Sequence, residues 1–189
     1  IISFFVGWVF GFGYFISNLY WITNSLTFDV NFKLIIPFAL ILIPLFLGIF
    51  YGLVTFLSSL FNLKNKLSSV LIFSIFFGGI EFLRSFILGG FPWNLLVFSV
   101  SNNLPSLQIL SYVGTYSLNL LSITIFLLPI IFFHKYKSSA AVIFFCFGLI
   151  LVVLNYSYGY FNIKNFEKKK YDKLDSVIRV VSPKVPIER

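Results

Sequence analysis

The sequence has few of the residues that soluble enzymes use for chemistry. It has no methionine, one cysteine, one histidine and only 6 acidic residues among 189. The single thiol, Cys146, lies in an apolar run and forms no disulfide framework. His134 lies beside a lysine at a helix end, where a helix-capping role is the better interpretation. The sequence shows no Gly-rich phosphate loop, zinc spacing or Ser/His/Asp set, so we expect no metal and no cofactor.

The absence of methionine also bears on completeness. A chain without methionine lacks the standard initiator residue, and its last residues, VIRVVSPKVPIER, end without a terminating element. We therefore expect the sequence to be an internal piece of a longer protein.

Charged residues are scarce at 11%, whereas hydrophobic residues make up 59% of the chain. A soluble domain of this length has too little interior to bury so much apolar side chain. A helix crosses a bilayer with about 20 mostly apolar residues. We therefore predict an all-α polytopic membrane bundle over residues 1–157, with about five transmembrane helices. Their expected positions are 1–23, 34–61, 68–88, 106–133 and 138–157.

The net charge of +8 would favour nucleic-acid binding in a soluble protein, but here lysines flank the apolar segments, so the expected partner is the membrane. Loops 62–67 and 134–137 each carry two lysines and no acid, whereas loops 24–33 and 89–105 carry no net positive charge. The positive-inside rule places the lysine loops in the cytoplasm and the C-terminal tail outside. If the basic tail is instead a cytoplasmic extension, the orientation inverts.

Two further patterns concern helix packing and the tail. Gly7 and Gly11 are four residues apart and predict close approach of the first helix to a neighbour. Residues 158–176 are polar and basic and are expected to form a linker. The β-branched run at 177–181 then predicts one strand, whose sheet would have to lie elsewhere.

Glu81 and Arg84 are the acid and the base of the third apolar segment. Their spacing of three residues places them on one helix face, where they can pair. Charges within a span usually face the bundle interior or a polar cavity. Two interpretations stay open. In the structural one, the pair locks two helices together or lies near enough to the membrane surface to be hydrated. In the functional one, it forms a polar notch in which Arg84 binds a phospholipid phosphate.

A rigid aromatic turn follows, with the sequence Gly89-Gly90-Phe91-Pro92-Trp93. The glycines end the helix, Pro92 fixes the turn, and Trp93 is expected at the membrane surface. Trp93 could simply anchor the loop there. The apolar segment after it is too short to span, so it lies in the interface or re-enters the bundle.

These pieces resemble the membrane part of apolipoprotein N-acyltransferases. That family typically has an acid and an arginine a few residues before Gly-Phe-Pro-Trp, followed by a Gly-x-Tyr helix start, here Gly114-Thr115-Tyr116. Residues 7–26 resemble the family's helix with a Gly-rich start and a Tyr-Trp end. The segment at 182–186, Ser-Pro-Lys-Val-Pro, only partly matches the family's Gln-Pro-Asn-Ile-Pro.

The resemblance implies a bacterial inner-membrane enzyme, expected to be a monomer, whose extracytoplasmic nitrilase-like domain carries a Glu-Lys-Cys triad. That domain would begin at 177–189, and the family's first two helices would be missing. The enzyme moves an acyl chain from a phospholipid to the diacylglyceryl-cysteine of a lipoprotein. No catalytic residue falls in this chain, so we expect it to be inactive alone. The candidate lipid-binding residues are Glu81, Arg84, Gly90, Phe91, Pro92, Trp93 and Tyr116.

Two other functions remain open. One is a membrane transport or scaffold protein whose charge pair lines a path or pins helices. The other is a membrane module fused to a different enzyme, such as a glycosyltransferase. The next ~250 residues of the parent protein would decide, since they would contain the adjoining domain.

Overall fold

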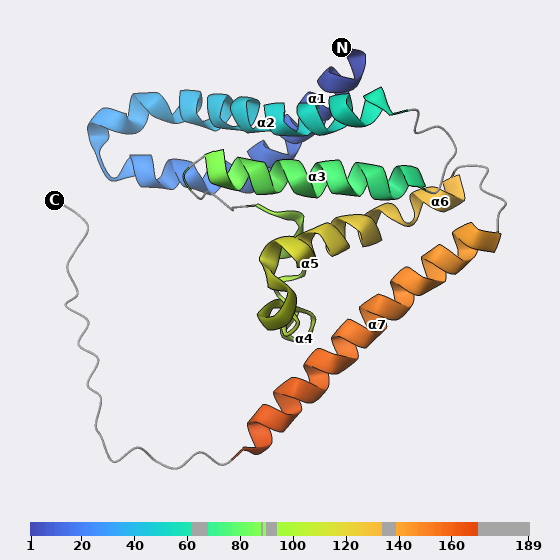
Figure 1. Cartoon of the computed structure of the whole chain (residues 1–189). Helices are drawn as coiled ribbons and strands as arrows, with labels where there is room; N and C mark the ends of the chain where they lie inside the picture. The colour runs from blue at the N-terminus through green and yellow to red at the C-terminus, as the bar shows by residue number, and fades with distance from the viewer. Residues whose placement is uncertain (62–67, 88, 90–93, 134–138, 170–189) are drawn as a thin grey trace, which may run out of the picture.

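Long apolar helices dominate the computed structural model, which describes residues 1–61, 68–87, 89, 94–133 and 139–169 (Figure 1). The elements are α1 (Ile2–Leu19), η1 (Tyr20–Thr27), η2 (Val30–Ile35), α2 (Ile36–Leu60), α3 (Ser68–Ile87), η3 (Leu96–Val100), α4 (Leu104–Leu107), α5 (Leu110–Leu127), α6 (Ile130–Phe133) and α7 (Ser139–Lys168). The described residues contain no strand, and the strand predicted at 177–181 lies outside them.

Five helical stretches are long and apolar enough to cross a membrane. They are Ile2–Thr27, Val30–Leu60, Ser68–Ile87, Leu110–Leu127 and Ser139–Lys168. The predicted all-α bundle of about five spans is therefore confirmed for the described part of the chain. Figure 1 shows α2 and α3 running side by side, with α5 next to α3 and the long α7 beyond α5.

Helices α1 and α2 pack closely because glycines line their contact. A Cβ atom on Gly11 would lie 2.9 Å from the Cα of Gly48, and one on Gly48 would lie 2.9 Å from the carbonyl oxygen of Trp8. The indole of Trp8 donates a hydrogen bond to the Leu45 carbonyl of α2, at 2.8 Å. The close approach predicted from Gly7 and Gly11 is thus confirmed.

The α1–α2 contact gives a direct test with a matched control. Gly11→Val should lower the free energy of unfolding by about 1–3 kcal/mol, because the new side chain meets the backbone of α2. Gly13→Val on the same helix has open space around its Cβ and gains slightly in helix propensity, so the free energy of unfolding should stay unchanged or rise by roughly 0.3 kcal/mol. Thermal unfolding in detergent micelles measures both, and equal shifts would contradict the packing argument.

The fourth expected span, 106–133, proves to be three helices rather than one. Gly114 has φ 76° and ψ 166°, a conformation that only glycine adopts readily, and it breaks the start of α5. Pro129 lies between α5 and α6 and has no N–H to continue the helix. The regular part of α5 therefore begins after Gly114, as the Gly-x-Tyr pattern predicted.

Helix α7 extends beyond the expected end at residue 157, to Lys168. Residues 158–168 of the expected linker are therefore helical. Two side-chain amides of α7, one before residue 158 and one after it, bond to α4 and to the residue that follows α4. The Nδ2 of Asn155 donates to the Ser106 carbonyl at 3.0 Å, and the Nδ2 of Asn162 donates to Oε1 of Gln108 at 2.9 Å. The Asn162 bond thus gives the added part of α7 a tertiary contact.

Candidate functional site

Glu81 lies where three helices meet. It faces inward from α3 and is 0% exposed. The Tyr51 hydroxyl of α2 donates to its Oε1 at 3.0 Å, and the Nδ2 of Asn119 of α5 donates to its Oε2 at 2.5 Å. A buried carboxylate needs such donors because the hydrocarbon interior offers no water. The acidic side chain thereby joins α2, α3 and α5.

Arg84 follows Glu81 by one helical turn and is also 0% exposed. Both side chains lie on the buried face of α3, as the spacing of three predicted. The guanidinium carbon lies 5.2 Å from the ring centroid of Phe15 of α1, a cation–π arrangement. In this conformation Arg84 presents no surface to an outside ligand, and its direct contact with a lipid phosphate stays a prediction.

Tyr116 joins the same region from α5. Its hydroxyl donates to Oγ of Ser85 at 2.6 Å, and its ring meets Phe82 edge-on at a centroid distance of 5.0 Å. Ser85 directly follows Arg84, so three of the sequence-predicted residues lie on or against the same stretch of α3. The other four, Gly90, Phe91, Pro92 and Trp93, lie outside the described residues.

The apolar segment after Trp93 re-enters the bundle. Leu95 and Val97 are each 1% exposed, and η3 packs against α5. The Val97 N–H donates to Oδ1 of Asn119 at 2.9 Å, and the Tyr14 hydroxyl of α1 donates to the Asn94 carbonyl at 3.1 Å. The segment therefore packs into the bundle, and its depth in the membrane stays a prediction. Such irregular backbone is tolerated at membrane depth only where protein covers it.

Sequence reasoning missed Tyr51, Asn119 and Tyr14, which hold these groups in place. A usable signal was present, because Asn119 is the only amide side chain within Leu110–Leu127. A polar side chain inside a span is costly and marks a buried partner. Nothing in the sequence indicated that this partner is Glu81.

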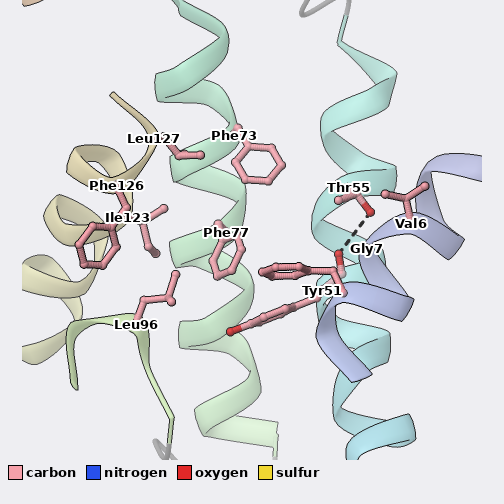
Figure 2. A pocket seen from close by; sticks show the side chains of 11 residues that line it. Val6, Gly7, Tyr51, Thr55, Phe73, Phe77, Leu96, Ile123, Phe126 and Leu127 are labelled. Carbon is pink, nitrogen blue, oxygen red and sulfur yellow. Dashed lines mark hydrogen bonds between the residues drawn. The ribbon is translucent and has the colours of Figure 1, made fainter. Parts of the chain in front are cut away.

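An apolar cavity of about 430 Å³ lies beside this cluster. Figure 2 shows it in front of α3, with α5 on one side and α1 and α2 on the other. Tyr51 links the two features, because its ring lines the cavity while its hydroxyl bonds Glu81. Leu96 of the re-entrant segment also lines the cavity. The other lining residues are Val6, Gly7, Phe10, Thr55, Phe73, Phe77, Ile123, Phe126 and Leu127.

The size and lining of the cavity indicate the chemistry it could accept. Its volume falls in the range of small-molecule sites, roughly 300–1,000 Å³, and its wall is almost wholly hydrocarbon and aromatic. No group of three or more His, Cys, Asp or Glu side chains that could hold a metal occurs among residues that the structure describes. Cys146 lies exposed on α7, away from this wall. The cavity suits an apolar chain.

Comparison with known proteins identifies the family. Residues 2–128 match the family model described as the apolipoprotein N-acyltransferase N-terminal domain. The chain belongs to this family. The N-terminal-domain match covers α1 to α5 and includes Glu81, Arg84, Asn119 and the re-entrant segment.

Individual relatives agree with the N-acyltransferase assignment. The chain is similar to proteins named apolipoprotein N-acyltransferase from Rhizobium rhizogenes (28% identical over 189 residues, 98% of this chain and 34% of the relative) and Agrobacterium fabrum (29% over 188 residues, 99% and 34%). It is 35% identical over 125 residues to that from Brucella melitensis (66% and 23%). The chain thus spans about a third of the length of the curated relatives that match most of it. No solved structure matches it.

Proposed function

We propose that this chain is the lipid-binding membrane part of an enzyme that moves an acyl chain from a phospholipid to the α-amino group of a diacylglyceryl-cysteine on a lipoprotein. The family match over residues 2–128 carries this proposal. The apolar cavity and the buried polar cluster beside it support it, because an acyl donor needs an apolar site next to the reacting end.

The reaction divides into two steps, both on a cysteine outside this chain. A thiolate attacks the ester carbonyl of the phospholipid, so that a C–S bond forms, the ester C–O bond breaks and the lysophospholipid leaves with a proton. The lipoprotein amine then attacks the thioester. A C–N bond forms, the C–S bond breaks, and the amine proton passes to the departing sulfur. The 189 residues alone are expected to be inactive.

The contribution of this chain is to bind and orient the donor. The Phe91–Trp93 turn would form the entrance in the outer leaflet, next to Arg84 and Tyr116. The re-entrant segment after Trp93 would guide the acyl chain, since Leu96 already lines the 430 Å³ cavity. Glu81 and Arg84 lie enclosed behind this path and would set the position of its wall.

The proposed orientation follows from charge. Loops 62–67 and 134–137 would face the cytoplasm, and residues 24–33, 89–105 and the C-terminal tail would face outward. The protein is a multi-pass membrane protein, and we place it in the bacterial inner membrane. The outward tail would then lead toward the catalytic domain.

One observation favours a second candidate function, a transport or scaffold protein. Both oxygens of Glu81 are hydrogen-bonded, to α2 and α5, and its side chain is fully enclosed. A carboxylate held in this way pins helices whether or not a lipid binds nearby. Acyl transfer itself must therefore separate the two candidates.

The experiment uses the full-length parent protein in liposomes that contain phospholipid with an isotope-labelled acyl chain. A synthetic diacylglyceryl-cysteine peptide is the acceptor, and mass spectrometry follows the added chain. Transfer by the parent supports the proposal. An inserted, folded parent that leaves the peptide unmodified would favour the transport or scaffold candidate. The 189-residue chain is the inactive comparison.

A cavity-filling variant tests the acyl-chain path. Leu96→Trp places an indole in the 430 Å³ cavity and should slow transfer about tenfold or more, since the chain loses its space. Leu151→Trp is the matched control, because Leu151 of α7 lines a separate cavity of about 380 Å³ between α3, α5 and α7. Thermal unfolding of both variants shows whether they fold. If the cavity-filling variant and the control both fold and transfer acyl chains at equal rates, the acyl chain does not pass through the 430 Å³ cavity.

A further inference from the structure

Asn119 uses both ends of its side chain in a fully buried position. The Oδ1 atom accepts from the Val97 N–H at 2.9 Å, and the Nδ2 atom donates to Glu81 at 2.5 Å. Asn119 itself is 0% exposed. One amide on α5 thus connects an irregular backbone segment to an acidic side chain of α3.

The re-entrant segment is held at two points on either side of Leu95. The Tyr14 hydroxyl bonds the Asn94 carbonyl, and Asn119 bonds the Val97 amide. Leu96 lies between these points and contributes to the cavity wall. The backbone hydrogen bonds of η3, such as that from the Phe98 N–H to the Leu95 carbonyl at 3.0 Å, fix its local shape but not its place in the bundle. Side-chain bonds to other helices therefore determine where Leu96 lies.

We propose that Asn119 is a positioning residue for the phospholipid donor: by holding the Val97 amide and the Glu81 carboxylate together, it places Leu96 in the wall of the acyl-chain cavity. This inference rests on the proposed function. It assigns Asn119 to the first step, in which the donor lipid must lie correctly, and gives it no part in the attack by the lipoprotein amine.

The chemistry of the site explains why asparagine is needed there. Its amide supplies one acceptor and two donors in a compact side chain. Leucine would fill a similar volume and satisfy neither partner. Aspartate would still accept from the Val97 N–H but would place a second carboxylate against Glu81. The pair can be exchanged, because Asn119→Asp combined with Glu81→Gln keeps an acceptor for Val97 and restores a donor across the contact.

Matched variants of the full-length parent test this directly. Asn119→Ala removes the contacts with both Val97 and Glu81, whereas Asn119→Asp removes only the one with Glu81. Combining Asn119→Asp with Glu81→Gln restores that contact, with the glutamine as donor and the aspartate as acceptor. Ser122→Ala is the control, since Ser122 is a buried residue of α5 whose hydroxyl donates to the Leu118 carbonyl of its own helix. Thermal unfolding in micelles identifies any variant that fails to fold.

Two measurements are made on each folded variant. Hydrogen–deuterium exchange reports protection of the amides in 94–100, and single-turnover kinetics separate formation of the acyl-enzyme from its reaction with the lipopeptide. Asn119→Ala should exchange faster in this segment because the Val97 amide loses its acceptor, and Asn119→Asp should do so less because it keeps that acceptor. Their acyl-enzyme formation should slow about tenfold, as expected for loss of a buried hydrogen bond to a charged group. The second step should stay unchanged, and the double variant should recover.

The outcomes separate this inference from the proposed function. Unchanged exchange, an unchanged donor step, or equal slowing of both steps in Asn119→Ala would overturn the positioning role. The same holds if Ser122→Ala slows the donor step as much. A wild-type parent that transfers no acyl chain would overturn the proposed function itself. A parent that is active at the same donor rate with and without Asn119 would overturn only this inference.

Discussion

Glu81→Ala should destabilise the folded bundle by about 3–5 kcal/mol, the usual cost of removing one partner from a buried charged site. The change leaves the Tyr51 hydroxyl and the Asn119 amide without their acceptor and removes a negative charge one helical turn from the buried Arg84. These groups belong to three different helices, so the loss weakens the contacts of α3 with both neighbours. Unfolding in mixed micelles with increasing denaturing detergent measures the free energy.

Two comparison variants show whether this cost belongs to the buried site. Glu81→Gln keeps an oxygen that can accept from one donor, so it should cost less, about 1–2 kcal/mol. Asp29→Ala removes an exposed acid whose side chain accepts from the Asn31 N–H and caps η2, and it should cost about 1 kcal/mol or less. If Glu81→Ala unfolds no more easily than Asp29→Ala, the cluster does not hold the bundle together.

The helical membrane fold could be predicted because the long apolar segments indicate that the chain lies in a lipid bilayer. Apolar segments of membrane-spanning length recur five times, and length alone fixes this feature. The contact through Gly7 and Gly11 was also predictable, since four-residue spacing places small residues on one face. Both are local properties of one segment. They need no knowledge of which helix lies opposite.

The contacts of the candidate site could not be predicted in the same way. Val97 and Asn119 are 22 residues apart, and Asn119 and Glu81 are 38 residues apart. Helices that are apolar all round give no periodic signal of which face turns inward. Glu81 and Arg84 could be placed on one face because they share a helix. Their partners on α1, α2 and α5 depend on how the helices pack.

Arg84→Ala in the full-length parent should lower acyl transfer at least about tenfold while the protein stays inserted. The guanidinium is enclosed against the Phe15 ring, one turn before the segment that leads to Trp93. Because Arg84 is as deeply buried as Glu81, its loss also weakens the fold, so the rate is compared per folded, inserted protein. Arg84→Lys should restore little, because lysine lacks the planar guanidinium that stacks on a ring and bonds in two directions. The labelled phospholipid assay measures each rate.

Two further variants show whether a slower rate in Arg84→Ala reflects the donor site. Trp93→Ala should slow the same step if the turn forms the entrance to the cavity. Lys33→Ala removes an exposed basic residue from the loop that the charge pattern places on the same side, and should leave the rate near that of wild type. Folded Arg84 and Trp93 variants with wild-type rates would instead show that the charge pair and the aromatic turn only anchor helices. The donor site would then have to lie elsewhere in the protein.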